Sequence, residues 1–161
     1  MRVRSARAED IPVLAGIAER SYRSAFKSIL EEEALAQRNA AYFADRFAAE
    51  WERMLVALRD EAPVGFLLMI DAHIDMLFMD PEASGQGGGA LLLAHAEAQG
   101  AASLECFRDN HDARRFYERH GWRLAREYER DFAGRNRRFV LYAKPFPPLP
   151  TGERWGAGHS L

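Results

Sequence analysis

The sequence lacks several features that would assign a protein to a common class at once. It contains one cysteine, Cys106, so an internal disulfide or a metal site of several cysteines is impossible. The longest apolar run, residues 64–70, is far too short to cross a bilayer. The charged N-terminal residues include no apolar segment typical of a signal peptide. We therefore expect a cytoplasmic protein with no membrane partner.

Neither an excess charge nor a metal-binding spacing is present. The formal net charge of −2 argues against a protein that mainly coats nucleic acid or anionic membrane. The five histidines show no paired spacing such as H-E-x-x-H, so we expect no metal. Arginines gather over residues 126–138, but Glu127, Glu129 and Asp131 alternate with them. This pattern favours a solvated mixed-charge surface over a nucleic-acid partner.

The composition is that of an ordinary globular protein. Of the 161 residues, 48% are hydrophobic and 29% charged, which is enough apolar material to bury a substantial core. We expect one domain over residues 1–144. Residues 145–161 begin with a segment that contains four prolines, so we expect an irregular tail there.

Periodicity predicts an alternation of strands and helices. Apolar residues recur every three or four positions in the segments expected to be helical, which begin near Asp10, lie within residues 31–50, cover 90–99 and run from Asn110 or Asp112 to His120. Strands are expected at residues 2–6, 54–59, 63–70, 72–79, 101–107, 122–131 and 138–144. The predicted order is β-α-α-β-β-β-α-β-α-β-β, an α/β fold in the broad sense that includes α+β arrangements.

A glycine-rich segment between a predicted strand and a predicted helix carries the clearest chemical signal. We call it the glycine loop; it consists of Ser84, Gly85, Gln86, Gly87, Gly88, Gly89 and Ala90. Glycines let the backbone approach a ligand closely, and the first amides of a helix favour anions such as a pyrophosphate. The motif G-x-x-x-x-G-K-[ST] is absent, which excludes a P-loop nucleotide hydrolase.

Two other interpretations of the glycine loop remain open at this point. Gly85, Gly87 and Ala90 fit the dinucleotide fingerprint G-x-G-x-x-[GA], and Glu105 lies about 20 residues further on. However, residues 80–83 separate the loop from its strand, and too few residues follow for the remaining βαβ units. The loop could also be a simple turn, although three successive glycines cost about 0.5–1 kcal/mol each relative to alanine.

Two blocks of sequence resemble those of the GNAT N-acetyltransferase superfamily. The first is Met76-Leu77-Phe78-Met79-Asp80-Pro81-Glu82 with the glycine loop, which is similar to a hydrophobic strand, a V-x-P-like turn and R/Q-x-x-G-x-G/A. Gly87 and Gly89 match the two small positions, whereas Ser84 stands where Arg or Gln is usual. The second is Asn110-x-x-Ala113-x-x-Phe116-Tyr117-x-x-x-Gly121-Trp122, similar to N-x-x-A-x-x-[FL]-Y-x-x-x-G-[FW]. With the order of elements, the resemblance covers residues 1–144.

The resemblance implies an acetyl-CoA-dependent transfer of an acetyl group to a primary amine. It also implies a mixed, mostly antiparallel central sheet flanked by helices, in which strands 72–79 and 101–107 run parallel and splay apart to hold the cofactor. The glycine loop would bind the pyrophosphate, and the backbone amides of Leu77, Phe78 and Met79 would bind the thioester and pantetheine. Asn110, Ala113 and Tyr117 would complete the cofactor site, although Asn110 could also act only as a helix cap.

The expected chemistry requires a proton donor for the leaving thiolate and a base for the amine. Tyr117 is the expected acid, because a phenol with an ordinary pKa of about 10 stays protonated at pH 7. Asp75 and Glu105 are the candidate bases; His73 or a chain of waters could serve instead. Cys106 lies within a predicted strand and is expected to be a small buried residue rather than a nucleophile. We therefore expect direct transfer.

One alternative belongs to another functional class. The same fold could be a catalytically weak module that binds or senses acyl-CoA, because Ser84 departs from the usual motif and the base is not identified. The acceptor is open among small-molecule amines, amino acids, peptide N-termini and lysine side chains. Hairpin edges can pair across chains, so a homodimer is one expected assembly.

Overall fold

Four strands from the first part of the chain form an antiparallel sheet, and tight turns join the last three of them. The strands are β1 (Arg2–Ser5), β2 (Met54–Arg59), β3 (Ala62–Ile70) and β4 (His73–Met79), and they pair in that order. Asp60 and Glu61 join β2 to β3 with φ angles of 51° and 65°. Two successive left-handed residues give the turn whose twist matches a two-residue hairpin. The computed structural model describes residues 1–144, so the predicted irregular tail lies outside the described residues.

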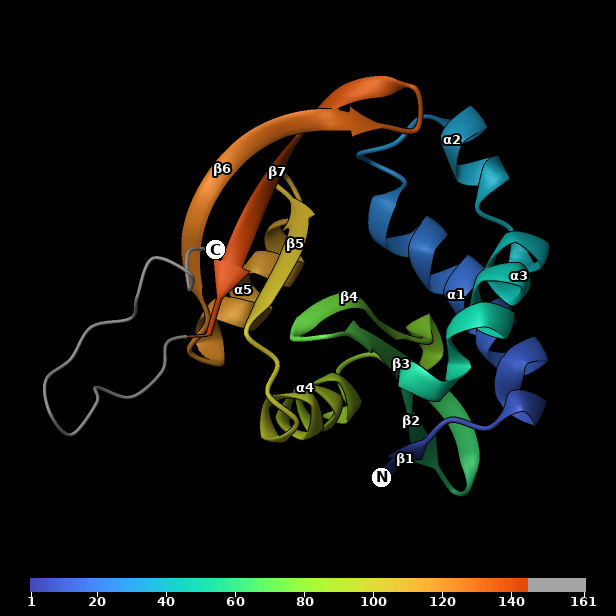
Figure 1. Cartoon of the computed structure of the whole chain (residues 1–161). Helices are drawn as coiled ribbons and strands as arrows, with labels where there is room; N and C mark the ends of the chain where they lie inside the picture. Colours follow the sequence, from blue (N-terminus) through green and yellow to red (C-terminus); the bar gives the residue numbers. More distant parts are fainter. Residues whose placement is uncertain (145–161) are drawn as a thin grey trace, which may run out of the picture. The chain divides into compact units, whose positions relative to one another are not determined.

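The described chain divides into two compact units, each of which is described by itself. The first, Met1–Ala101, contains the four-stranded sheet with helices α1 (Ile11–Phe26), α2 (Glu32–Gln37), α3 (Ala40–Glu50) and α4 (Gly88–Ala98) (Figure 1). The second begins at Ala102 and contains β5 (Ser103–Phe107), α5 (His111–Arg119), β6 (Arg123–Phe132) and β7 (Arg135–Ala143). In the second unit β7 pairs antiparallel with both β5 and β6. The predicted α/β fold of mostly antiparallel strands is confirmed.

Helices cover both faces of the first sheet because side chains alternate along its strands. On β4, the ring of Phe78 lies 6.0 Å from that of Phe26 and 6.2 Å from that of Tyr22, both on α1. The next residue, Met79, points to the other face and lies beside Gly88, where α4 begins. Figure 1 accordingly draws α1 and α3 on one side of β2–β4 and α4 on the other.

The single helix predicted within residues 31–50 is wrong, because two helices occupy that segment. α2 ends at Gln37 and α3 starts at Ala40. Between them Asn39 is extended, and its Oδ1 accepts a hydrogen bond of 2.9 Å from the Tyr42 N–H. An asparagine in this position is a favoured N-cap, so local capping chemistry interrupts a continuous apolar pattern. The other predicted helices and strands are present, with ends displaced by no more than three residues.

The cores of the two units are apolar, with one ion pair largely withdrawn from solvent. The Arg4 guanidinium donates to both carboxylate oxygens of Asp10 at 2.8 and 2.9 Å. The hydrogen bonds from Arg4 hold the pKa of Asp10 below its usual value, against the opposing effect of burial. This pair ties β1 to the start of α1. No helix within residues 1–144 is both long and apolar enough to cross a membrane.

Candidate active site

The glycine loop connects β4 to α4 and leaves backbone donors at the start of the helix. The Leu91 N–H donates a hydrogen bond of 3.1 Å to the Gly87 carbonyl, and this bond begins the helical ladder of α4. The N–H groups of Gly88, Gly89 and Ala90 therefore precede the helical ladder. Gly85 and Gly87 adopt φ angles of 79° and 89°, which disfavour any residue with a side chain. A Cβ on either would meet no heavy atom within 4 Å, so the loop is open on that side.

Gly88 has a packing role that the sequence pattern did not reveal. A Cβ there would approach the Met79 side chain at less than 3.0 Å. Gly65, opposite Met79 on β3, is equally tight: its Cβ would lie 2.9 Å from the Phe78 carbonyl oxygen. The Met79 side chain therefore packs between two glycines, Gly65 on the sheet and Gly88 at the start of α4. Only the absence of side chains at both positions allows this close approach.

An irregularity in β4 places Asp75 beside α3. Met76 pairs with Leu68 and Ile74 with Met69, so Asp75 is the extra residue of a β-bulge. Its Oδ2 accepts a hydrogen bond of 2.5 Å from the Arg46 guanidinium. Leu77, Phe78 and Met79 follow in regular register with Leu67, Phe66 and Gly65. The first unit thus brings together Asp75, residues 77–79 and the glycine loop along one strand and its exit.

In the second unit, the second sequence block forms a helix with a cap at each end. Asn110 accepts a hydrogen bond of 3.3 Å on Oδ1 from the Ala113 N–H, at the start of α5. At the other end Gly121 has a φ of 86°, its N–H bonds to Glu118 O, and the Trp122 N–H bonds to Tyr117 O at 3.0 Å. This is the Schellman arrangement, in which the residue after the glycine packs back onto the helix. The Trp122 and Tyr117 rings indeed lie 6.2 Å apart.

Tyr117 lies on the buried face of α5 among aromatic rings. The residue is 8% exposed, with Phe116 at 5.2 Å and Tyr142 at 6.3 Å between ring centroids. Within residues 1–144 its hydroxyl makes no side-chain hydrogen bond. Burial, with a smaller effect of Cys106, raises the pKa of Tyr117 well above its ordinary value. The phenol therefore stays protonated far beyond neutral pH.

Cys106 is suited to packing rather than to nucleophilic chemistry. Burial of this β5 residue raises the pKa of its thiol to about 12, with opposing help to the thiolate from Arg114. Almost no thiolate is present near neutral pH, and the thiolate is the reactive form. Arg114 itself donates from Nε to the Tyr142 hydroxyl at 3.0 Å, and Tyr142 donates to Glu118. These bonds join α5 to β7.

Both carboxylate oxygens of Glu105, the other predicted base, accept hydrogen bonds. Arg130 donates to both of its carboxylate oxygens, with 2.9 Å from Nε to Oε2, and the Tyr128 hydroxyl donates to Oε2 as well. Burial and the bond to Glu105 raise the pKa of Tyr128 to about 12. This bidentate pair joins β5 to β6, which is the arrangement of a structural ion pair.

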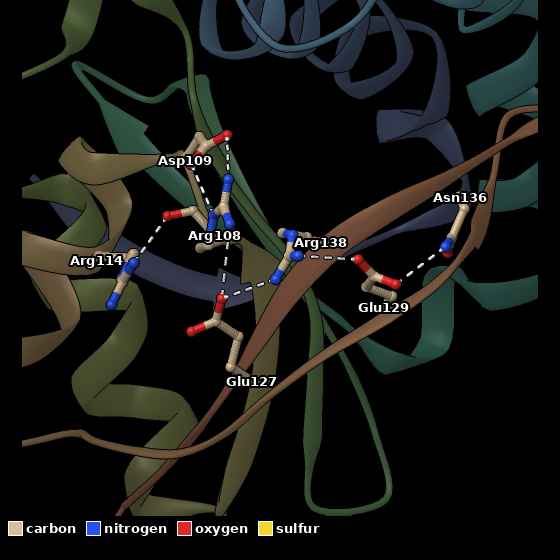
Figure 2. Close-up of polar contacts among 7 residues, drawn as sticks. All are labelled: Arg108, Asp109, Arg114, Glu127, Glu129, Asn136 and Arg138. Atoms are coloured by element: carbon tan, nitrogen blue, oxygen red, sulfur yellow. Dashed lines mark hydrogen bonds and ion pairs between the residues drawn. The ribbon is translucent and has the colours of Figure 1, made fainter.

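Two arginines of the final hairpin, Arg130 and Arg138, are paired with carboxylates. Figure 2 shows Arg138 between Glu127 and Glu129, at 3.7 and 3.3 Å, and Arg108 at 3.8 Å from Glu127. The predicted mixed-charge surface is confirmed for these residues. Within the described residues, no group of three or more His, Cys, Asp or Glu side chains is arranged to hold a metal ion.

The two blocks and the helices that carry them have close counterparts among known proteins. The model of the Acetyltransferase (GNAT) family matches residues 18–122. The chain belongs to this family. The peptidyl-lysine N-acetyltransferase YjaB of Salmonella typhimurium is 34% identical over 96 residues, which cover 58% of this chain and 60% of that relative. The chain thus spans about three fifths of the length of this curated relative.

Solved structures extend the likeness in fold to nearly nine tenths of the chain. The solution structure of apo YjaB from Escherichia coli superposes with a TM-score of 0.70 at 26% identity, covering 88% of this chain and 95% of that one. The PaiA N-acetyltransferase of Thermoplasma acidophilum, solved in complex with coenzyme A, has a TM-score of 0.71 at 20% identity. It covers 89% of this chain and 98% of its own, and it shows the shared fold.

Proposed function

We propose that this GNAT family member transfers the acetyl group of acetyl-CoA directly to the side-chain amine of a lysine in a protein or peptide. The observation that carries the proposal is that each of the two family blocks forms a defined part of the fold in this chain. The glycine loop leads into α4 with its amides ahead of the helical ladder, and Tyr117 lies on the doubly capped α5. The name of the Salmonella relative supports lysine as the acceptor.

The glycine loop fits the phosphates of coenzyme A. The glycine loop offers amides and an unobstructed surface at Gly85 and Gly87, which suits an anion approached closely by backbone. We assign the pyrophosphate to Ser84, Gly85, Gln86, Gly87, Gly88, Gly89 and Ala90, and the pantetheine and thioester to Leu77, Phe78, Met79, Asn110 and Ala113. Bound there, acetyl-CoA would supply an acetyl group activated as a thioester.

Tyr117 is the proposed acid of the transfer. The amine nitrogen bonds to the acetyl carbon as the carbon–sulfur bond breaks, and the Tyr117 hydroxyl gives its proton to the departing sulfur. Its hydroxyl has no competing side-chain partner in the described chain, and its raised pKa keeps the proton in place until then. Because the Cys106 thiol is not ionised near neutral pH, the acetyl group passes directly to the amine.

The structure favours Asp75 over Glu105 as the base that takes the ammonium proton. Arg46 contacts Asp75 only at Oδ2, which leaves Oδ1 without a bonded partner within residues 1–144. Both oxygens of Glu105 accept hydrogen bonds already. A carboxylate oxygen that is free to accept a proton, directly or through a water, is what the step requires.

The activity is tested by measuring free CoA released from acetyl-CoA with a thiol reagent. We expect release with a peptide that contains one free lysine and a blocked N-terminus. The matched control peptide has norleucine in place of the lysine and should release no CoA. Calorimetric binding of acetyl-CoA without CoA release from any amine would instead identify an acyl-CoA-binding module, and binding of NADH would revive the dinucleotide alternative.

The base is tested by the dependence of kcat/KM on pH. Asp75→Asn should lower kcat/KM about 100-fold at pH 7 and flatten the rise of the rate with pH, because general-base catalysis contributes about 10²–10⁴-fold. Glu105→Gln, the matched carboxylate-to-amide change in the second unit, should leave the shape of the profile unchanged. The reverse result would transfer the role to Glu105.

A homodimer and a cytoplasmic location stay predictions.

A further inference from the structure

The segment that forms the pyrophosphate site contains no cationic residue of its own. Residues 60–107, which include β3, β4, the glycine loop, α4 and β5, contain neither lysine nor arginine. Ser84 occupies the position where the family pattern usually has Arg or Gln. A pyrophosphate carries two negative charges close together, and backbone amides alone provide only partial positive charge. A cationic side chain that contacts this ligand would therefore come from another part of the chain.

The sheet topology places Arg59 at the edge where the glycine loop begins. β2 and β4 flank β3 and are both antiparallel to it, so β2 and β4 run in the same direction. Ala57 pairs with Gly65, and Gly65 pairs with Met79. Arg59, the last residue of β2, therefore lies at the same sheet edge as the exit of β4. From there its Nη1 donates a hydrogen bond of 2.8 Å to Oε1 of Gln86, inside the loop.

Arg59 also differs from its neighbours in having a neutral partner. Six arginines of the first unit pair with carboxylates; they are Arg2, Arg4, Arg20, Arg23, Arg46 and Arg53. Within residues 1–144 no carboxylate is bonded to Arg59. Its charge is thus held at the loop by an amide, which orients a guanidinium without neutralising it.

The charge of Arg59 also acts on Asp80, which lies four residues before the loop. Asp80 caps the short 3₁₀ turn Pro81–Ala83, and Arg20 donates to its Oδ2 at 2.7 Å. Burial would raise the pKa of Asp80, but the bonds from Arg20 and the Glu82 N–H lower it, with a further contribution from Arg59. Arg20 is therefore paired with Asp80, whereas Arg59 is hydrogen-bonded to an amide within the loop.

We propose that Arg59 binds the pyrophosphate of acetyl-CoA and supplies the positive charge that an arginine in place of Ser84 would have given. Gln86 holds the guanidinium beside the loop and releases or shares it when the anion arrives. The positive charge is supplied by the last residue of β2 instead of by a residue of the loop. This inference rests on the proposed function, because it names a further residue of the same cofactor site.

The test is the affinity of Arg59→Gln for CoA and for 3′-dephospho-CoA, measured by calorimetry at low salt. Loss of a charge-assisted hydrogen bond at a partly exposed site should raise both dissociation constants about tenfold. The loss should shrink at about 1 M salt, where the screening length falls to about 3 Å. Arg53→Gln, immediately before β2, removes the same charge from a residue paired with Glu50 and should change either constant less than about twofold.

A second substitution returns the cation to its usual place in the motif. Ser84→Arg in the Arg59→Gln background should restore affinity to within about threefold of the wild type, and should do less in the wild type itself, because two sites with a shared ligand are not additive. Unchanged affinity in Arg59→Gln would overturn the inference while leaving the proposed function intact. A loss for CoA alone would assign Arg59 to the 3′-phosphate and overturn the pyrophosphate assignment. A wild type that binds neither ligand would overturn both proposals.

Discussion

Replacing Tyr117 with phenylalanine is expected to lower kcat about 100-fold, the lower end of the range for general acid catalysis. The change removes one hydroxyl from a ring that is held by Phe116, Trp122 and Tyr142. Because the hydroxyl makes no side-chain hydrogen bond within residues 1–144, its removal should not destabilise the fold. The dissociation constant of acetyl-CoA should change less than about threefold, since the lost interaction forms mainly as the thiolate leaves.

The pH dependence separates an acid from a packing residue. The pKa of Tyr117 is raised by burial, so the phenol remains protonated through and above its ordinary value of about 10. The wild type should consequently show no loss of kcat up to about pH 10 from ionisation of this group. Tyr42→Phe on α3 serves as the matched control and should keep wild-type kcat. A Tyr117→Phe variant with unchanged kcat would remove the acid role and leave Tyr117 as a core residue.

Replacing Trp122 with alanine should lower the free energy of unfolding by about 3–5 kcal/mol, the range for truncating a buried large aromatic residue. Trp122 is 2% exposed and is the largest of the fully buried side chains. It follows Gly121 in the Schellman turn and packs onto Tyr117, so its loss opens a cavity where α5 ends. The measurement is urea unfolding monitored by circular dichroism.

Milder substitutions keep this prediction testable if the alanine variant fails to fold. Trp122→Phe should cost about 1–2 kcal/mol, because part of the ring contact with Tyr117 survives. Trp51→Ala, in the turn between α3 and β2, changes the same residue type where it is only half-buried and should cost less than Trp122→Ala. Equal losses at Trp51 and Trp122 would show that the turn at Gly121 has no special packing role.

The same residues explain why the second sequence block could be interpreted without a structure. Asn110 caps α5, Gly121 ends it in the left-handed region, and Trp122 folds back on Tyr117. Each of these interactions spans three to five residues, so a linear pattern contains all of the atoms involved. Asp60-Glu61 and Ala133-Gly134 are equally local features, and both pairs have the positive φ angles of hairpin turns.

Other parts of the fold and site depended on contacts that no local pattern contains. The helix expected over residues 31–50 divides at Asn39, because a cap competes with an uninterrupted apolar periodicity. Gly88 was counted with the phosphate-binding glycines, yet it also leaves room for Met79, which the sequence places nine residues earlier. Close backbone approach of this kind follows from how the sheet and helix pack, and a glycine alone does not reveal which neighbour needs the space.

The sequence by itself determined the order of the strands, most of the helices and the places of the glycine loop and Tyr117, because periodicity, turns and caps act over a few residues. Only the tertiary structure decided which charged groups serve those parts. Arg46 meets Asp75 across 29 positions, and Arg59 meets Gln86 across 27. Such pairings depend on strand order and register, since one residue of slippage would turn each side chain to the opposite face. The cation missing from the glycine loop was therefore found only once β2 and β4 were seen to end at one edge.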